Sequence, residues 1–219
     1  MSLREQGLTY LQEGKLEAAA SSFLQAIEDE PDNAINYVNL GDVLIQVGED
    51  EKALPLFKKA VEIDEDMATA YYSIGTLYYK NEKYKEAMES FEKALKKGLQ
   101  TADNYFMLGM SMIHLDQPKL ALPYLQRATE LNPMDVDAHL QYGLCLGGLG
   151  LFEAAKTQMG KVLDLKPNEP DAYYNLGVVY YMHENNFTKA KECFEKAIEI
   201  KPDHALSAYG IKLIEKQGM

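Results

Sequence analysis

The chain has 219 residues, of which 47% are apolar and 26% are charged, and its formal net charge is −12. This composition is ordinary for a folded protein that is long enough to bury a substantial core. The longest uncharged run, residues 138–152, is too short to span a bilayer, and the first residues lack the apolar segment of a secretory signal. Two isolated cysteines, Cys145 and Cys193, fit a reducing compartment, so we expect a cytoplasmic protein with no membrane partner.

The negative charge is concentrated near the start of the chain. Residues 1–67 contain 15 acidic and 5 basic residues, whereas residues 68–219 contain 19 and 17. Solvated acidic turns would explain this excess, and attraction of a basic partner is the alternative. The chain has no basic stripe that could neutralise phosphates, so nucleic acid is not an expected partner.

Glycines and large apolar residues recur along the chain with a period of 34 residues. Within residues 68–101, apolar residues recur at steps of three and four on both sides of a polar turn, which is typical of two amphipathic helices. A short helix hairpin cannot bury its apolar face alone, so each hairpin needs a neighbour. The repeat glycines are Gly7, Gly41, Gly75, Gly109, Gly143 and Gly177, and the large residues 16 or 17 positions later are Phe23, Phe57, Phe91, Leu125, Met159 and Phe194.

The period predicts the elements in chain order. The second helix of the third hairpin is followed by Gly98, which suits a left-handed helix stop, and the fourth hairpin has Pro118 near the start of its second helix. In the last helix, Lys212 and Glu215 stand where a following helix would bury the residue, so we expect this helix to cap the array. The predicted hairpins are residues 1–33, 34–67, 68–101, 102–135, 136–169 and 170–203, and the single helix is residues 204–217.

Residues 173–202 carry the repeat pattern almost completely, as YYNLGVVY followed by AKECFEKAIEIKP. This pattern resembles the tetratricopeptide repeat family, and within it a bacterial-type adaptor, and the resemblance covers essentially the whole chain. It implies an all-α fold. The expected architecture is a right-handed α-solenoid of six 34-residue helix-turn-helix hairpins plus a C-terminal capping helix, in a single domain spanning residues 1–219.

The resemblance also implies where a partner binds, because the first helices of successive hairpins line the concave groove of such a solenoid. On each first helix, the residues three before, one after and four after the repeat glycine form a stripe that does not face the hairpin partner. We call it the first-helix stripe. From the third hairpin onward it carries no charge, and an exposed apolar band usually marks a contact surface.

We therefore predict that the groove binds a peptide through residues on and beside the first-helix stripe. The alternative is that these side chains pack between adjacent first helices and are only half exposed. The predicted peptide-binding residues are Val38, Asn39, Asp42, Tyr72, Thr76, Tyr79, Phe106, Met107, Met110, His114, Leu140, Gln141, Leu144, Tyr174, Asn175, Val178 and Tyr181.

The chemistry of the stripe favours a basic or apolar segment of a protein partner over an acidic one. Tyr72, Tyr79, Tyr174 and Tyr181 flank methionine and aliphatic residues, which suits adaptable peptide recognition. Arg4 is the only basic residue on the stripe. A clamp for a terminal carboxylate, which the resemblance would allow, is therefore not expected.

The sequence predicts no catalytic, cofactor or metal site. Its four histidines lie at unrelated repeat positions, and none pairs with a cysteine at metal-ligand spacing. The ladder of Asp103, Asp137 and Asp171 belongs to the first turns of helices, where acidic residues are common. The glycines from Gly143 to Gly150 follow no strand, which argues against a phosphate loop.

Two functions remain from different classes. The first is a non-enzymatic adaptor that binds a partner segment, extended or helical, in its groove. The second is an assembly subunit that docks a partner, or itself, through the groove or a terminal hairpin. The sequence leaves the oligomeric state open.

Overall fold

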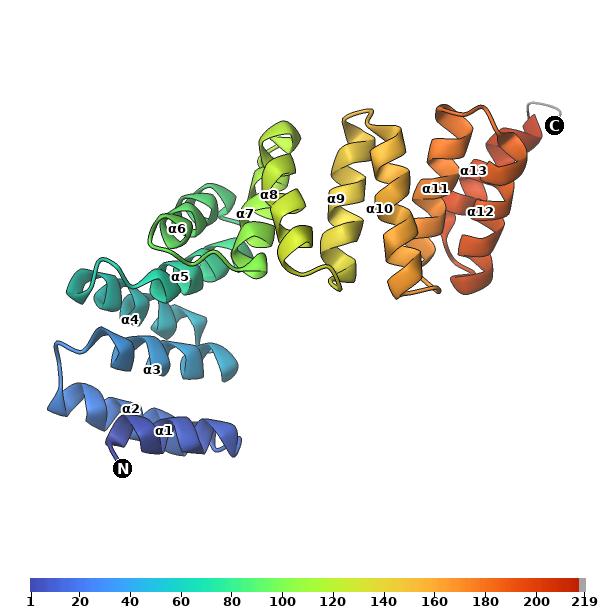
Figure 1. The fold of residues 1–219 in the computed structure, drawn as a ribbon. Helices are drawn as coiled ribbons and strands as arrows, with labels where there is room; N and C mark the ends of the chain where they lie inside the picture. The colour runs from blue at the N-terminus through green and yellow to red at the C-terminus, as the bar shows by residue number, and fades with distance from the viewer. Residues whose placement is uncertain (217–219) are drawn as a thin grey trace. The chain divides into compact units, whose positions relative to one another are not determined.

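The structure is a computed structural model that describes residues 1–216. In this part of the chain, all regular secondary structure is α-helical (Figure 1). The helices are α1 (Leu3–Gln12), α2 (Leu16–Asp29), α3 (Ala34–Gln46), α4 (Asp50–Ile63), α5 (Ala68–Lys80), α6 (Tyr84–Lys96), α7 (Ala102–His114), α8 (Pro118–Leu131), α9 (Val136–Gly148), α10 (Phe152–Leu165), α11 (Pro170–Met182), α12 (Phe187–Ile200) and α13 (Ala205–Lys216). The predicted all-α solenoid of short helices is confirmed.

The helix boundaries follow the predicted period. Each odd-numbered helix from α3 to α11 begins at the first residue of a predicted hairpin, and α13 begins one residue after the predicted start of the last helix. Residue 217, the predicted end of that helix, lies outside the described residues. Lys212 and Glu215, the two polar residues at hairpin-packing positions, are exposed on α13.

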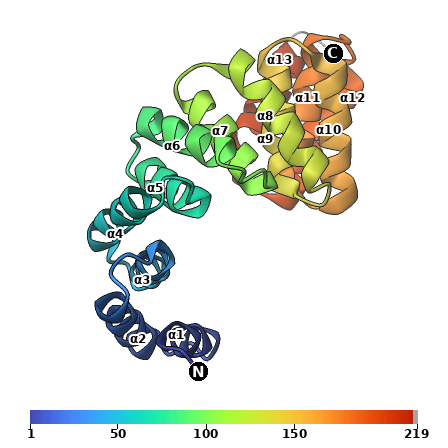
Figure 2. The ribbon, with the colours of Figure 1, turned by 60° about the vertical axis from the view of Figure 1, so that its left-hand side comes forward.

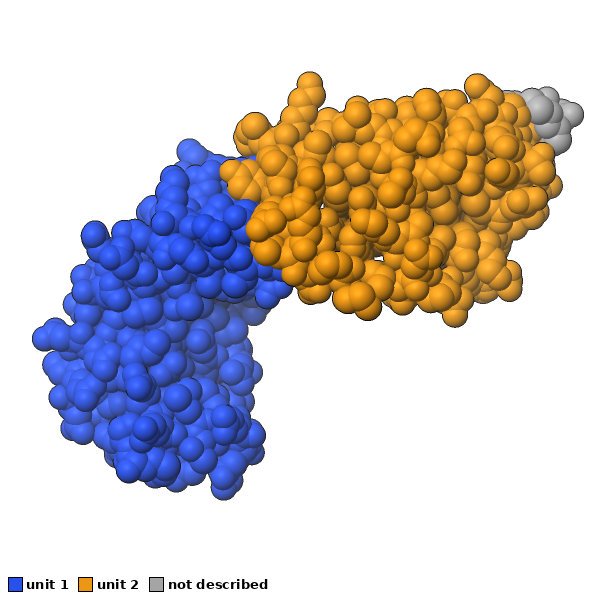
Figure 3. Space-filling view, in the orientation of Figure 1, with its two compact units in different colours: residues 1–115 blue, residues 116–219 orange. Residues whose placement is uncertain are grey.

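The chain divides into two compact units, residues 1–115 and residues 116–219 (Figure 3). Unit 1 contains α1 to α7, and unit 2 contains α8 to α13. The expectation of one continuous domain stays a prediction.

Within each unit, every helix packs against the next one along the chain (Figures 1 and 2). Helices two places apart also meet, namely α3 with α5 and α5 with α7 in unit 1, and α9 with α11 and α11 with α13 in unit 2. The first helices α3, α5 and α7 in unit 1, and α9 and α11 in unit 2, are therefore neighbours in sequence order. This arrangement brings their first-helix stripes side by side.

A repeat glycine lies under a large side chain in each hairpin that falls within one unit. A Cβ atom built on Gly75 would stand 2.7 Å from Cε1 of Phe91, whose ring is fully buried. The ring therefore occupies the volume that any larger residue at position 75 would need. The same contact recurs between Gly7 and Phe23, Gly41 and Phe57, Gly143 and Met159, and Gly177 and Phe194.

The turn inside each hairpin contains a residue with left-handed backbone geometry. Glycine fills this position in three hairpins, but Glu82 and Asp116 adopt φ 58° and Asn185 adopts φ 52° there. Glycine enters this region without strain, whereas a Cβ atom makes it costly. Gly98, with φ 101°, ends α6 as predicted.

Replacement of Gly75 by alanine should lower the free energy of unfolding by about 1–3 kcal/mol, because the added methyl group overpacks the contact with Phe91. The matched control is Gly160→Ala in α10, where a Cβ atom meets nothing within 4 Å. That change should stabilise the chain by up to about 1 kcal/mol through helix propensity. Thermal unfolding followed by far-UV circular dichroism checks both, and similar shifts in Tm would contradict the packing argument.

Replacement of Glu82 by glycine should raise the free energy of unfolding by about 1 kcal/mol, because it removes a side chain from a left-handed position. The reciprocal change, Gly48→Ala, places a side chain at the equivalent position with φ 83° and should destabilise by a similar amount. Urea denaturation of both variants measures the difference. A lower midpoint for Glu82→Gly than for the parent chain would refute the assignment of strain.

Candidate functional site

The predicted peptide-binding residues lie on α3, α5 and α7 in unit 1 and on α9 and α11 in unit 2. Two of them are core residues: Val38 is 4% exposed and Leu140 is 9% exposed. Val38 packs with Ile74 and Leu77, and Leu140 packs with Met159, so neither presents a free surface. Leu144 and His114 are exposed, and the others are half-buried. The stripe therefore combines internal packing with an accessible edge.

In unit 1, the aromatic ring of Tyr72 packs against the hairpin core. Its centroid lies 5.6 Å from that of Phe91, in a tilted arrangement. Burial raises the pKa of the Tyr72 hydroxyl, and the negative charge of Asp103 raises it further. The next stripe residue, Thr76, donates its hydroxyl to the carbonyl oxygen of Tyr72 at 3.1 Å. Tyr72 is thus held in place by its own hairpin while part of its surface stays accessible.

Tyr79, Tyr84 and His114 form an aromatic cluster that joins α5, α6 and α7. The rings of Tyr84 and His114 stack with centroids 4.2 Å apart and an interplanar angle of 5°. The hydroxyl of Tyr79 lies 3.0 Å from Nε2 of His114, within hydrogen-bond distance. Burial, followed by the nearby Tyr84, raises the pKa of Tyr79. His114 therefore contacts two tyrosines at one end of the unit 1 stripe.

Asp42 is a half-buried carboxylate on α3. The hydroxyl of Ser73 on α5 lies 3.4 Å from Oδ1 of Asp42 and can donate a hydrogen bond to it. Among the described residues, no basic side chain forms an ion pair with Asp42. Burial raises the pKa of Asp42 to about 6, and the Ser73 hydrogen bond opposes this shift. The charged form of Asp42 is therefore incompletely compensated.

The rest of the predicted unit 1 set is uncharged and half-buried. Asn39 lies on α3, three residues before Asp42. Phe106, Met107 and Met110 lie on α7. Flexible thioether side chains of this kind fill irregular contacts and adapt to a partner.

In unit 2, the tyrosines of the first-helix stripe also pack against aromatic residues of their own hairpin. Tyr174 lies 5.8 Å from Phe194, and Tyr181 contacts the edge of Phe187 at 5.4 Å, both between ring centroids. Val178, between them on α11, packs against the same cluster. Asn175 donates its side-chain amide to the carbonyl oxygen of Asp171 at 2.7 Å, which fixes its orientation.

A small apolar cavity of about 320 Å³ opens between α9, α10 and α11. Gly147 and Gly148 form one side of it, and Leu144, Val178 and Met182 contribute apolar side chains. Three of the predicted residues, Leu144, Asn175 and Val178, are thus brought together around one cavity. The half-buried Gln141 lies one turn before Leu144 on α9 and does not line it.

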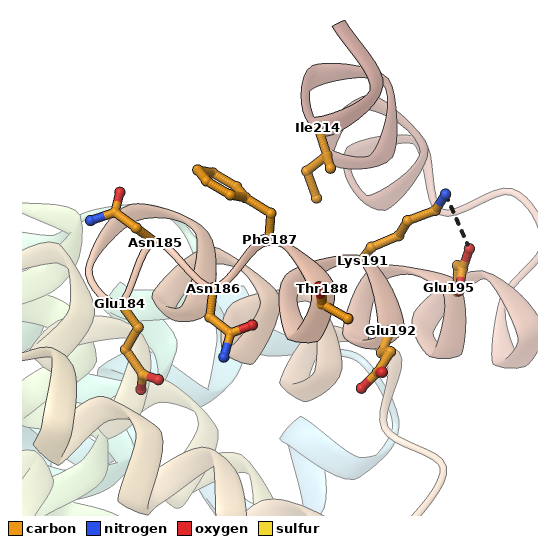
Figure 4. A pocket seen from close by; sticks show the side chains of 9 residues that line it. All are labelled: Glu184, Asn185, Asn186, Phe187, Thr188, Lys191, Glu192, Glu195 and Ile214. Atoms are coloured by element: carbon orange, nitrogen blue, oxygen red, sulfur yellow. Dashed lines mark ion pairs between the residues drawn. The ribbon is translucent and has the colours of Figure 1, made fainter. Parts of the chain in front are cut away.

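A wider depression of about 800 Å³ lies beside α12 and α13. Figure 4 shows its lining residues, with Phe187, Lys191 and Glu195 along α12 and Ile214 on α13. The ammonium of Lys191 lies 4.0 Å from carboxylate oxygens of both Glu195 and Glu215. Because its basic group already has acidic neighbours and its walls mix charges of both signs, this surface shows no single ligand chemistry.

The described residues contain no cluster of three or more histidine, cysteine, aspartate or glutamate side chains arranged to hold a metal ion. His139 is buried and lies within hydrogen-bond distance of the Gln158 side chain at 2.8 Å and of the Pro133 carbonyl oxygen at 3.0 Å. Within residues 1–216, no helix has the length and apolar character needed to cross a membrane.

The side chains that contact the stripe from neighbouring helices were not identified from the sequence. Tyr84, Phe152 and Phe187 share one repeat position at the start of a second helix, and each lies beside the end of a first helix. Tyr84 stacks on His114, Phe187 contacts Tyr181, and Phe152 lines the apolar cavity. Their spacing, 68 residues from Tyr84 to Phe152 and 35 from Phe152 to Phe187, was the available signal. Ser73 carried no such signal, because other residue types occupy its position in the other hairpins.

Family models match most of the chain. Models described as tetratricopeptide repeat match residues 68–97, 102–134 and 170–204, and a model described as TPR repeat matches residues 7–48, 41–82 and 149–184. No curated protein matches the chain.

Solved structures match it over most of its length. YrrB, described as a TPR protein with an unusual peptide-binding site, is 46% identical, covers 88% of this chain and 99% of its own, and superposes with a TM-score of 0.85. MamA from Desulfovibrio magneticus RS-1 is 26% identical, covers 79% of this chain and 97% of its own, and has a TM-score of 0.70. PilF from Pseudomonas aeruginosa shares the fold at 19% identity, with 94% of each chain covered and a TM-score of 0.77.

The period of 34 residues, the recurring contact between a repeat glycine and a large side chain, and these matches lead to one assignment. The chain belongs to the tetratricopeptide repeat family.

Proposed function

We propose that the protein is a non-catalytic interaction module that binds a basic or apolar segment of a protein partner on its first-helix stripes. The tetratricopeptide repeat fold supports a protein–protein interaction module. YrrB, to which the chain is 46% identical, is described as having a peptide-binding site. The proposed contacts are Asn39, Asp42, Tyr72, Thr76, Tyr79, Phe106, Met107, Met110 and His114 in unit 1, and Gln141, Leu144, Tyr174, Asn175, Val178 and Tyr181 in unit 2.

The observation that carries this proposal is that the carboxylate of Asp42 is half-buried without a basic partner among the described residues. A half-buried carboxylate that has only a hydroxyl partner is poorly solvated and lowers the stability of the free protein. An ammonium or guanidinium group from a partner would supply the missing counter-charge. This explains why a basic segment suits unit 1 better than an acidic one.

The stripe residues around Asp42 suit the rest of such a segment. Tyr72 and Tyr79 are held by contacts within their own unit, so they lose little conformational freedom when a partner binds. Met107 and Met110 can adapt to the shape of an apolar side chain. Tyrosine and methionine are also enriched in protein interfaces.

A second function, assembly through the last helix, is favoured by one observation. On α13, Leu206 and Tyr209 are 58% and 61% exposed and lie three residues apart, on one face of the helix. This face would bury apolar surface if it docked on a partner subunit or on a second copy of the chain.

Asp42→Asn should raise the free energy of unfolding by up to about 3 kcal/mol at pH 7. Burial raises the folded-state pKa from the ordinary value of 3.8 to about 6, so the ionised carboxylate destabilises the fold above pH 6. This cost fades as the pH falls from 6 to 4 and is absent below 3.8. The stabilisation should therefore disappear at pH 3.5 in urea titrations. Equal stability of both chains at pH 7 would remove the premise of an uncompensated charge.

Peptides selected on the full chain from a random phage-displayed library should be enriched in lysine or arginine. Asp42→Asn should weaken their binding at least about tenfold, measured by fluorescence anisotropy. Asp29→Asn, at an exposed position on α2, removes the same charge elsewhere and should change the affinity less than twofold. Binding should also weaken with added salt and as the pH falls below 6.

Two results would count against the peptide-binding proposal. The first result is unchanged affinity in two variants, Asp42→Asn and the double variant Tyr72→Ala with Tyr181→Ala. If the selected peptides bind both as tightly as the parent chain, the stripes are not used. Failure to select any peptide, together with self-association that Tyr209→Ser abolishes in analytical ultracentrifugation, would favour the assembly function instead.

A further inference from the structure

The fifth hairpin departs from the other hairpins at one stripe position. Four residues after the repeat glycine, the other five hairpins carry a large side chain, whereas the fifth carries Gly147. The next residue, Gly148, is again a glycine. The residues at the position of Gly147 in the other hairpins are Leu11, Ile45, Tyr79, Ile113 and Tyr181.

The absent side chain leaves space that the surrounding residues do not fill. A Cβ atom built on Gly147 would make an ordinary contact of 3.8 Å with Cβ of Ala155, and one built on Gly148 would meet nothing within 4 Å. The apolar cavity of about 320 Å³ lies here, closed on other sides by Phe152, Met159 and Val178. Its origin is therefore local: α9 lacks the side chain that the repeat normally supplies.

The walls of the cavity determine what can enter it. They are mostly apolar, so water gains few hydrogen bonds there. The volume is near the lower end of the range for ligand sites, about 300–1,000 Å³, which suits one large side chain. At its rim, Met182 is 67% exposed and flexible enough to close over an occupant.

The charge on the same surface indicates what flanks that side chain. Helices α9 and α11 contain no lysine or arginine, and Asp137 and Asp171 lie in their first turns. Lys166 is close enough for these two carboxylates to raise its pKa, but the largest cause of that shift is its hydrogen bond to Glu169, at 2.7 Å. His204 lies 3.1 Å from Asp171. The exposed carboxylate of Asp137 therefore provides a negative charge on the stripe side of α9.

We propose that the cavity beside Gly147 receives one leucine- or phenylalanine-sized side chain of a protein partner, followed or preceded by a basic residue that reaches Asp137. Ten helical residues separate Asp137 from Gly147, which is about 15 Å along α9. An extended peptide covers this distance in about four or five residues. The partner segment therefore carries its large apolar residue four or five positions from a lysine or arginine. This inference rests on the proposed function and adds a specific anchor point in unit 2.

The first experiment tests the cavity alone. N-acetyl-leucinamide and N-acetyl-phenylalaninamide are titrated into the full chain, with N-acetyl-alaninamide as the small control, and the methionine methyl signals are followed by NMR. We expect shifts at Met182 and Met159 with the two large amides. Gly147→Ile introduces the residue type that α3 and α7 carry at this position, fills the cavity and should abolish the shifts.

The matched control is Gly160→Ile in α10, where a Cβ atom meets nothing within 4 Å and the residue does not line the cavity. It should retain the shifts. Absence of shifts in the parent chain, or their persistence in Gly147→Ile, would refute the inference. Circular dichroism of both variants verifies that each remains helical.

The second experiment uses the library-selected peptides and separates this inference from the proposed function. Replacement of the peptide's large apolar residue by alanine should weaken binding to the parent chain at least about tenfold, and should have less than a twofold effect on Gly147→Ile. Peptides that require Asp42 but bind Gly147→Ile normally would refute the anchor while leaving the proposed function intact. If no peptide binds at all, the proposed function fails, and the amide titration still decides whether the cavity accepts a side chain.

Discussion

The contact between a repeat glycine and the large side chain about sixteen residues later sets the geometry of the hairpins. Because Gly75 has no Cβ atom, the ring of Phe91 lies directly over its backbone and becomes fully buried. This close approach fixes which face of each first helix turns toward its hairpin partner. The first-helix stripe is what remains on the neighbouring face, so its position follows from a packing requirement rather than from any feature of the stripe itself.

Because the glycine contact stabilises the hairpin and the stripe lies on another face, residues of the stripe can vary while the fold stays constant. Asp42 places an incompletely compensated carboxylate on the stripe, and Gly147 leaves out a side chain there. The hairpins that carry these two residues nevertheless keep the glycine–ring or glycine–methionine contact. Each departure lowers the packing or solvation quality of the free protein locally. Such local costs are expected where a surface serves binding as well as folding.

The half-buried tyrosines contribute both to the packing of a hairpin and to the binding surface proposed for the stripe. Tyr72 and Tyr174 pack against Phe91 and Phe194, so the same contacts that stabilise a hairpin also fix the orientation of a stripe residue. A side chain that is already ordered loses less entropy when a partner binds. The stack of Tyr84 on His114 has a similar effect at the end of the unit 1 stripe.

The sequence by itself determined the helix boundaries, the hairpin order and the glycine–ring pairs, because each hairpin contacts mainly its neighbours and therefore repeats a local pattern. The tertiary structure decided what that pattern leaves undefined. It buried Val38 and Leu140, paired Asp42 with Ser73, stacked His114 on Tyr84 and opened the cavity beside Gly147. These outcomes depend on side chains from adjacent helices that approach the stripe from different directions. The periodicity of a single helix gives the face on which a residue lies, but not how much of that face its neighbours cover.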